Sequence, residues 1–258
     1  MKGSGASRSG QDASRLAAVV FDAGGTLVRL DYEWMALAIT QMGHPMDAAR
    51  LRRGEIEGRR RYDSSRGIGD AALPQPLGAN GDIRAYLGGM LAAAGLPHYL
   101  IGPVIVRLLA RDRTSGLWAR PMEGARQALD AVAEMGLRCA VISNSDGRAE
   151  ATLERCEMTR GVEFVLDSHL VGVEKPDPGI FRMALERLAV APERALFVGD
   201  IRSVDEAGAR VAKMPFVLID PYGDYAAPGT AAIAGLESLA AFVASSYAVP
   251  RMVAGSGR

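Results

Sequence analysis

Short apolar segments alternate along this chain with segments in which apolar residues recur at every third or fourth position. The apolar segments, rich in Val, Ile and Phe, are residues 17–22, 138–144, 163–168, 195–200 and 215–220. Continuous hydrophobicity over so few residues predicts strands that are covered on both faces. The segments between them, residues 123–136, 147–158, 178–190 and 203–214, have the spacing of amphipathic helices. This alternation is typical of a doubly wound, parallel α/β sheet.

One long segment, residues 31–116, interrupts the alternation because it contains no convincing strand. Its apolar spacing predicts helices over 32–43, 46–63, 82–96 and 99–112, with a loose loop around 67–82. An insertion of this kind starts at the carboxyl end of the first strand, so we expect a helical cap that acts as a lid. The core is then predicted to comprise residues 14–30 and 117–248. The polar ends, residues 1–13 and 249–258, are predicted to be disordered tails.

Composition narrows the class of protein. Apolar residues make up 48% of the 258 residues and charged residues 23%, which is ordinary for a globular domain. The formal net charge is zero, so we expect no nucleic-acid partner. No apolar run reaches the roughly 20 residues that span a bilayer, so we expect no membrane segment. Cys139 and Cys156 are too few for a disulfide framework, which predicts a reducing, cytoplasmic environment. The oligomeric state stays open.

Polar residues follow the predicted strands or stand in nearby loops at four places. In open parallel sheets, ligands bind in the crevice outside the carboxyl ends of the strands. We therefore expect these side chains to share one site. They are Asp22 with Thr26, Ser143 with Asn144, Lys175, and Asp200 with Asp205.

The residue types in these four places suit phosphoryl transfer. Two carboxylates at strand ends, Asp22 and Asp200, can share a divalent cation with oxygen ligands, which favours Mg²⁺. A hydroxyl and an ammonium, those of Ser143 and Lys175, can neutralise the remaining phosphate oxygens. A metal-bridged Asp22 can then attack phosphorus as a nucleophile.

Each of these residues also has a purely structural interpretation. Asp22 before Gly-Gly could be a turn residue, and Ser143-Asn144 could cap a helix. Asp205 could be an acid in the first turn of a helix, and Lys175 could be a surface charge. Taken singly, these interpretations are favoured for all but Asp200. Taken together they are not, because the four groups occur in order in the sheet-forming part of the chain.

The four groups also match the ordered motifs of a known superfamily, and over nearly its whole length the chain resembles the haloacid dehalogenase (HAD) superfamily. The first motif, Asp-x-Asp-x-Thr after an apolar strand, is matched by residues 22–26 except at the second Asp, where Gly24 stands. The second is a strand ending in Ser or Thr, as at Ser143. Lys-Pro-Asp-Pro at 175–178 and Gly-Asp-x4-Asp at 199–205 match the third and fourth. The resemblance implies a five-stranded parallel, Rossmann-like core and a helical cap of the C1 type.

The resemblance also implies catalytic roles for the matching positions. Asp22 would be the nucleophile that forms an aspartyl-phosphate, and Ser143 and Lys175 would hold and neutralise the transferring group. Thr26 and Asn144 are expected to contact the substrate. The implied substrate is a small phosphorylated metabolite, and the implied enzyme is a hydrolase of phosphoric monoesters.

A Mg²⁺ ion is the cofactor that the resemblance implies. Asp22 and Asp200 would bind it through their carboxylates, and Gly24 would bind it through its backbone carbonyl. Asp205 would support the metal shell or Lys175. The loss of a side chain at position 24 leaves this main-chain ligand intact.

What Gly24 lacks is a group that protonates the leaving group or activates water, a contribution worth about 10²–10⁴-fold. Three hypotheses follow. In the first, the protein is a phosphatase whose general acid comes from another residue or whose substrate has a good leaving group. In the second, it is a dehalogenase whose Asp22 attacks carbon. In the third, it binds a phosphorylated metabolite without turnover. The metal-binding form of the fourth motif counts against dehalogenation, and we favour the phosphatase.

The predicted cap bears on the substrate. It contains no lysine, which excludes the Schiff-base chemistry of phosphonoacetaldehyde hydrolases, a branch that also lacks the second Asp. Arg59, Arg60, Arg61 and Tyr62 could reach a substrate, although a solvated helix face explains most of them. His44 is a weak candidate for a replacement acid.

Overall fold

The computed structural model describes residues 15–67 and 82–250 and divides into two compact units. The α/β unit lies within Met1–Leu27, Pro121–Asp200 and Val204–Arg258. The helical unit comprises Val28–Arg120 and Ile201–Ser203. The predicted tails, apart from a few residues, and nearly all of the predicted loop at 67–82 lie outside the described residues.

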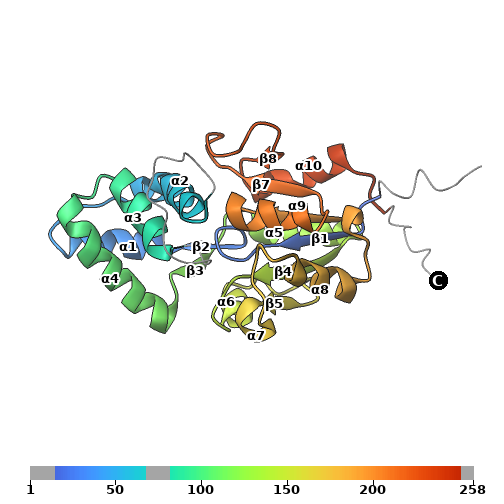
Figure 1. Ribbon diagram of the computed structural model, residues 1–258, viewed down its shortest axis with the longest axis horizontal. Coiled ribbons are helices and arrows are strands. Elements are labelled where there is room, and N and C mark those ends of the chain that lie inside the picture. Colours follow the sequence, from blue (N-terminus) through green and yellow to red (C-terminus); the bar gives the residue numbers. More distant parts are fainter. Residues whose placement is uncertain (1–14, 68–81, 251–258) are drawn as a thin grey trace, which may run out of the picture. The chain divides into compact units, whose positions relative to one another are not determined.

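A six-stranded sheet with the order β5-β4-β1-β6-β7-β8 forms the centre of the α/β unit (Figure 1). All its neighbouring strands are parallel, and Ala18 of β1 pairs with Arg138 of β4 on one side and Ala195 of β6 on the other. The strands are β1 (Ala18–Phe21), β4 (Arg138–Ser143), β5 (Val165–Asp167), β6 (Ala195–Gly199), β7 (Phe216–Ile219) and β8 (Ala232–Ile233). The predicted doubly wound α/β fold is confirmed.

The predicted number of strands, five, is wrong by one. The sixth strand, β8, has only two residues and pairs with β7 at the edge of the sheet. Ala232 is exposed and Ile233 is buried, and the segment around them, 231–234, is mostly alanine, unlike the Val-, Ile- and Phe-rich segments of the other five strands. A segment this short carries no periodicity that a sequence pattern could reveal.

Helices cover both faces of this sheet, as right-handed crossovers between parallel strands require. Residues of α8 and α9 share one hydrophobic cluster with Val20 of β1 and Phe197 of β6. Successive residues of a strand face opposite sides, so the neighbouring Val19 and Phe21 face the layer that contains α5. The helices are α5 (Ala125–Glu134), α6 (Ala149–Arg155), α7 (Ser168–Val171), α8 (Pro178–Leu188), α9 (Ala207–Val211) and α10 (Leu239–Ser246).

The predicted helix at 203–214 differs from the structure. The chain instead forms a π-helical turn at Arg202–Glu206, followed by the short helix α9. Within that turn the Asp205 side chain is directed back, and its Oδ2 accepts a hydrogen bond from the backbone N–H of Asp200 at 3.0 Å. The wider turn therefore coincides with a carboxylate that is held close to the end of β6, and π-turns are frequent at functional sites.

Four helices and a two-stranded sheet make up the helical unit. The helices are α1 (Tyr32–Thr40), α2 (Ala48–Ser65), α3 (Ile83–Ala93) and α4 (His98–Ser115), and the strands are β2 (Val28–Leu30) and β3 (Trp118–Pro121). The first three helices begin at an aspartate whose carboxylate accepts a backbone N–H of the first turn: Asp31, Asp47 and Asp82. All four helices predicted between 31 and 116 are present.

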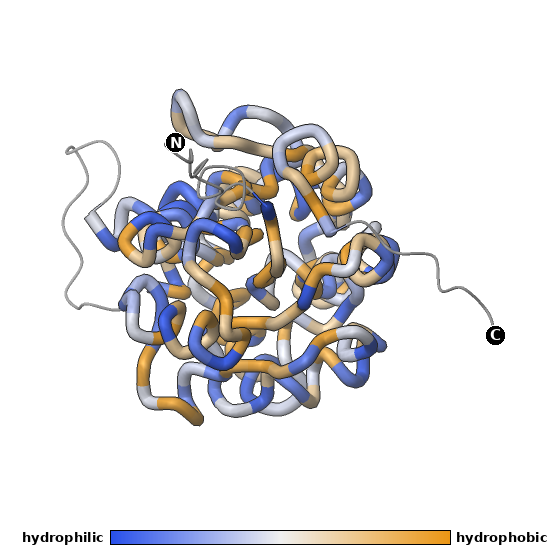
Figure 2. The backbone as a smooth tube through the Cα atoms, turned by 90° about the vertical axis from the view of Figure 1, so that its right-hand side faces the viewer, coloured by the Kyte–Doolittle hydropathy of each residue, from blue (hydrophilic) through white to orange (hydrophobic). Residues whose placement is uncertain are grey.

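The helical unit has a hydrophobic core of its own, which includes Met35, Leu51 and Leu87. Figure 2 shows the alternation of hydrophobic and hydrophilic stretches along the backbone that packed helices and strands require. Within the described residues, none of the helices combines the length and the apolar character needed to cross a bilayer.

Candidate active site

Three buried aspartates gather at the carboxyl ends of β1 and β6 in the α/β unit. Asp22 follows β1 directly, and its N–H continues the ladder with a hydrogen bond of 2.9 Å to Val198 of β6. Asp200 follows β6, and Asp205 lies in the π-turn. One carboxylate oxygen from each lies within 4.8 Å of the other two. The sequence-predicted cluster of carboxylates is thus brought together.

Lys175 completes this cluster. It comes from the loop before α8, and its side chain is only 1% exposed. Its Nζ donates to Asp22 Oδ1 and, at 2.8 Å, to Asp205 Oδ1. It also lies 5.4 Å from the centre of the Phe197 ring. An ammonium with so little access to water is stable only because two carboxylates accept from it.

The electrostatics of the cluster are dominated by burial. Burial raises the pKa of the Asp22 carboxyl to about 6; Lys175 opposes the rise and Asp205 adds to it. Burial alone would lower the pKa of the Lys175 ammonium, but Asp205 and Asp22 outweigh it and leave that pKa above its ordinary value. Three carboxyl groups face one ammonium, so the ionised cluster carries two excess negative charges.

These residues fit a divalent cation such as Mg²⁺. Oxygen donors are the ligands that Mg²⁺ prefers, and the excess negative charge matches its charge. Asp22 Oδ2 is buried and has no hydrogen-bond partner among the described residues. A buried carboxylate oxygen in this condition is costly unless a ligand meets it.

Two glycines let the backbone approach these carboxylates. Gly25 has φ +88°, and a Cβ at this position would overlap the Asp200 carboxylate. Gly199, the last residue of β6, faces the side chain of Asp205, where a Cβ would also overlap. The glycines of the first and fourth motifs therefore leave room for the aspartates of the fourth.

The remaining predicted residues of the first two motifs lie in the same part of the α/β unit. Ser143 is the last residue of β4, and its side chain is buried. Thr26 is fully buried, and its Oγ1 has no hydrogen-bond partner among the described residues. Gly24 is half-buried in the loop after β1 and, unlike Gly25, does not have a positive φ.

Asn144 makes a pair of hydrogen bonds with the backbone of Lys175. Its Nδ2 donates to the Lys175 carbonyl at 2.8 Å, and its Oδ1 accepts the Lys175 N–H, also at 2.8 Å. The side-chain amide thus pairs with one residue as a neighbouring strand would. The substrate contact predicted for Asn144 stays a prediction.

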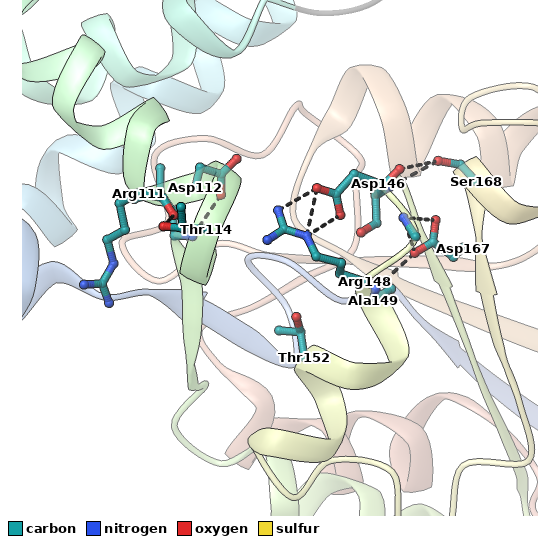
Figure 3. Close-up of polar contacts among 12 residues, drawn as sticks. Arg111, Asp112, Thr114, Asp146, Arg148, Ala149, Thr152, Asp167 and Ser168 are labelled. Atoms are coloured by element: carbon teal, nitrogen blue, oxygen red, sulfur yellow. Dashed lines mark hydrogen bonds and ion pairs between the residues drawn. The ribbon is translucent and has the colours of Figure 1, made fainter.

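Asp167, at the end of β5, is a further buried carboxylate that is not among the residues predicted from the sequence. Its carboxylate accepts backbone N–H groups from Gly147, in the loop after β4, and from Ala149, the first residue of α6, at 3.0–3.1 Å (Figure 3). The Ser168 hydroxyl accepts the N–H of Ser145 in the same loop at 3.1 Å. The signal was present, because Asp167 is an acid at the end of an apolar run, as Asp22 and Asp200 are.

The four residues of the helical unit that were predicted as possible substrate contacts, 59–62, have partners within that unit. Arg59 is buried, and its Nη2 lies 3.8 Å from Glu55, which also accepts the hydroxyls of Tyr32 and Tyr86. Burial raises the pKa of Tyr32, and the Glu55 charge adds to this. The other candidate residues pair on the same helix or pack by ring contact: Arg60 and Arg61 with Glu57, and Tyr62 with the Tyr86 ring.

A family model described as haloacid dehalogenase-like hydrolase matches residues 16–213, more than half of the chain. The chain belongs to the haloacid dehalogenase-like hydrolases. Within this family it is 31% identical over 231 residues to phosphoglycolate phosphatase of Rhodospirillum rubrum. The aligned segment covers 87% of this chain and 86% of that protein.

One further relative and one solved structure help to define the likeness. Haloacid dehalogenase-like hydrolase domain-containing protein 3 of Xenopus laevis is 44% identical over 108 residues, or 42% of this chain. The matched segment spans only 44% of that relative, less than half its length. A crystal structure of a dehalogenase with an intermediate complex has a TM-score of 0.57 at 22% identity and covers 89% of this chain and 97% of that one. At this identity the likeness concerns the fold alone.

Proposed function

We propose that this haloacid dehalogenase-like hydrolase is a Mg²⁺-dependent phosphatase that acts on a small phosphorylated metabolite. The observation that carries the proposal is the buried cluster of Asp22, Asp200 and Asp205 around Lys175. The phosphoglycolate phosphatase that matches most of the chain supports the same class of substrate. We also propose that the helical unit is a cap of the C1 type, and that Gly24 replaces the second aspartate of the first motif.

The proposed reaction begins at Asp22. Lys175 holds Oδ1 of this carboxylate and so fixes its orientation. Attack by the carboxylate on phosphorus forms an aspartyl-phosphate, and the bond from phosphorus to the ester oxygen breaks, so that the alcohol departs. Water then cleaves the aspartyl-phosphate, which releases inorganic phosphate and restores the carboxylate. Mg²⁺, when bound by Asp22, Asp200 and the Gly24 carbonyl with Asp205 in support, supplies positive charge beside the phosphate oxygens.

The other residues of the site have supporting roles in this proposal. Ser143, at the end of β4, and Thr26, in the loop after β1, are both buried and donate hydrogen bonds from their hydroxyls to the phosphate oxygens. Lys175 neutralises charge that develops on the phosphoryl group, which is the main protein contribution to such reactions. Gly24 supplies no proton, so the leaving group departs as an anion or takes its proton from water.

A substrate screen with and without Mg²⁺ tests the proposal. Aryl, acyl, alkyl and sugar phosphates and 2-haloacids are offered to the wild type, to Asp22→Asn and to Asp200→Ala, with Asp130→Asn on α5 as a matched control. We expect Mg²⁺-dependent phosphate release that both site variants lose and the control retains. Circular dichroism verifies that each variant folds.

Two outcomes contradict the phosphatase. Turnover of 2-haloacids that resists a chelator assigns the cluster to dehalogenation. Binding of a phosphorylated metabolite without product, in a folded wild type with Mg²⁺ present, assigns the protein to the non-catalytic class. Full activity of Asp22→Asn refutes the nucleophile while leaving the substrate class intact.

A further inference from the structure

We propose that Asn144 is the positioning residue of Lys175, so that its amide controls where the buried ammonium meets Asp22 and Asp205. The inference deepens the proposed function, since it rests on Lys175 acting on the phosphoryl group. Its structural part, the fixing of the Lys175 side chain, does not depend on that function.

The pairing itself is the first support. Both polar atoms of the Asn144 amide bond to the backbone of one residue, with the donor on the Lys175 carbonyl and the acceptor on its N–H, each at 2.8 Å. Two parallel bonds fix the direction of the main chain as well as its distance. An amide engaged in this way holds the residue from which the ammonium extends.

The second support is the demand at the other end of Lys175. Its Nζ donates to two carboxylates from separate segments, Asp22 after β1 and Asp205 in the π-turn. Holding a long side chain in one rotamer costs conformational entropy, so the two ion pairs depend on a backbone position from which a single rotamer reaches both carboxylates. Both pairs are buried, so the loss of either would leave a buried carboxylate uncompensated.

The third support is that Asn144 is itself held. It follows Ser143 at the end of β4, and the loop after it is bound to the end of β5 by Asp167 and Ser168 (Figure 3). The Asp167 carboxylate accepts from Gly147 and Ala149. The amide therefore transmits the position of the sheet to Lys175, and no bound substrate is required for this contact.

The chain offers a direct readout of Lys175, because its only lysines are Lys2, Lys175 and Lys213. Amine acylation followed by peptide mass spectrometry reports the labelling of Lys175 relative to Lys213, which is exposed. Asn144→Leu keeps the approximate shape of the side chain but can form a hydrogen bond with neither the carbonyl nor the N–H of Lys175. Asn144→Asp keeps an acceptor for the N–H and loses the donor. Asp146→Asn is the matched control, since this exposed side chain of the same loop pairs with Arg148 and takes no part in holding Asn144 or Lys175.

We expect Lys175 to be protected in the wild type and in Asp146→Asn, to be labelled several-fold more in Asn144→Leu, and to be intermediate in Asn144→Asp. In the phosphatase assay, kcat should fall by up to about 10²-fold in Asn144→Leu, the cost typical of a misplaced group. The factor should be the same for every substrate, with KM little changed.

Unchanged labelling of Lys175 in a folded Asn144→Leu variant overturns the proposal. So does a rise in KM that differs between substrates while labelling stays low, because that result makes Asn144 a substrate contact. If Asn144→Leu fails to fold, Asn144→Asp decides the question by the same labelling ratio. A protein that turns over no phosphate still gives the labelling result, so failure of the proposed function is distinguishable from failure of this inference.

Discussion

At the scale of the residue, position 24 matters most to the chemistry that we propose, because we infer that glycine replaces a carboxylate there. The loop after β1 supplies Asp22 and Thr26, whereas Gly24 adds no side chain between them. Positive φ occurs at Gly25 and not at Gly24, so position 24 does not require the left-handed backbone that favours glycine. The proposed replacement of a carboxylate by Gly24 can therefore be tested by a single substitution.

We expect wild-type activity to depend steeply on the pKa of the leaving group. Aryl and acyl phosphates, whose leaving groups depart without a proton, should turn over much faster than alkyl or sugar phosphates. Gly24→Asp should raise alkyl phosphate turnover selectively, by about 10-fold or more. Gly24→Asn, which has the same shape but a weaker acid–base group, is the control for loop packing. A flat dependence on leaving-group pKa in the wild type would contradict this prediction.

At this scale the sequence predicts some contacts of the candidate site and not others. Asp22, Lys175, Asp200 and Asp205 were predictable, because strand ends and motif spacing place them at one edge of the sheet. The pairing of Asn144 with the Lys175 backbone was not, because the two residues lie in separate loops. Their contact depends on how both loops fold, which no local pattern records.

At the scale of the element, the loops after the strands are held by carboxylates that accept main-chain N–H groups. Asp167 does this for the loop after β4, and Asp220 does it for the loop that connects β7 to β8. Asp220 is buried and accepts the N–H groups of Gly223, Tyr225 and Ala226 at 2.9–3.1 Å. Such contacts satisfy backbone groups that a short edge strand leaves unpaired.

The pH dependence of stability should report on Asp220. Burial favours its neutral form, but main-chain N–H groups, those of Ala226 and Tyr225 foremost, outweigh burial and hold the pKa of Asp220 below its ordinary value. Because the folded-state pKa is lowered, the stabilisation is complete above the unfolded-state pKa of about 3.9. It is lost as the pH falls through the folded-state pKa.

Asp220→Asn should therefore lower the free energy of unfolding by about 1–3 kcal/mol at neutral pH. The difference from the wild type should shrink as the pH falls below the unfolded-state pKa of about 3.9. Urea unfolding curves at neutral pH and across this acid range measure it. Asp224→Asn, the same charge change on an exposed side chain of the same loop, serves as the control. A difference that stays constant with pH would rule out the charged carboxylate as its source.

The elements that the sequence pattern missed share a physical cause. The strands β2, β3 and β8 have two to four residues, and their stability comes from partners distant in the chain. A π-turn at 202–206 stands where a regular helical start was predicted, and within it Asp205 is directed towards the end of β6. Long periodic segments, by contrast, formed the predicted elements, since their burial is decided locally.

At the scale of the whole molecule, the two units have separate hydrophobic cores. One cluster joins the sheet to α8 and α9, and another joins α1, α2, α3 and α4. Units with their own hydrophobic cores can lose protection independently of each other. The sequence predicts a cap over residues 31–116, whereas the main segment of the helical unit is Val28–Arg120. The two ranges differ by a few residues at each end, where β2 and β3 pair.

We expect Leu87→Ala to destabilise the helical unit alone. Leu87 is fully buried on α3, and removing its side chain should cost about 2–5 kcal/mol. Hydrogen exchange should then quicken in α1–α4 and stay unchanged in β1, β4 and β6. The reciprocal variant, Leu188→Ala on α8, should show the opposite pattern. Equal loss of protection in both units would show that they unfold as one.

The central place of β1 in the sheet sets the order in which a growing chain can assemble. Ala18 pairs with Arg138 and with Ala195, so both neighbours of β1 are synthesised more than a hundred residues after it. The helical unit is nearly contiguous and can be completed on the ribosome while β1 still has two open edges. An apolar strand in that condition is prone to aggregation. We therefore expect chaperones to bind the nascent chain until β6 has emerged from the ribosome and can pair with β1.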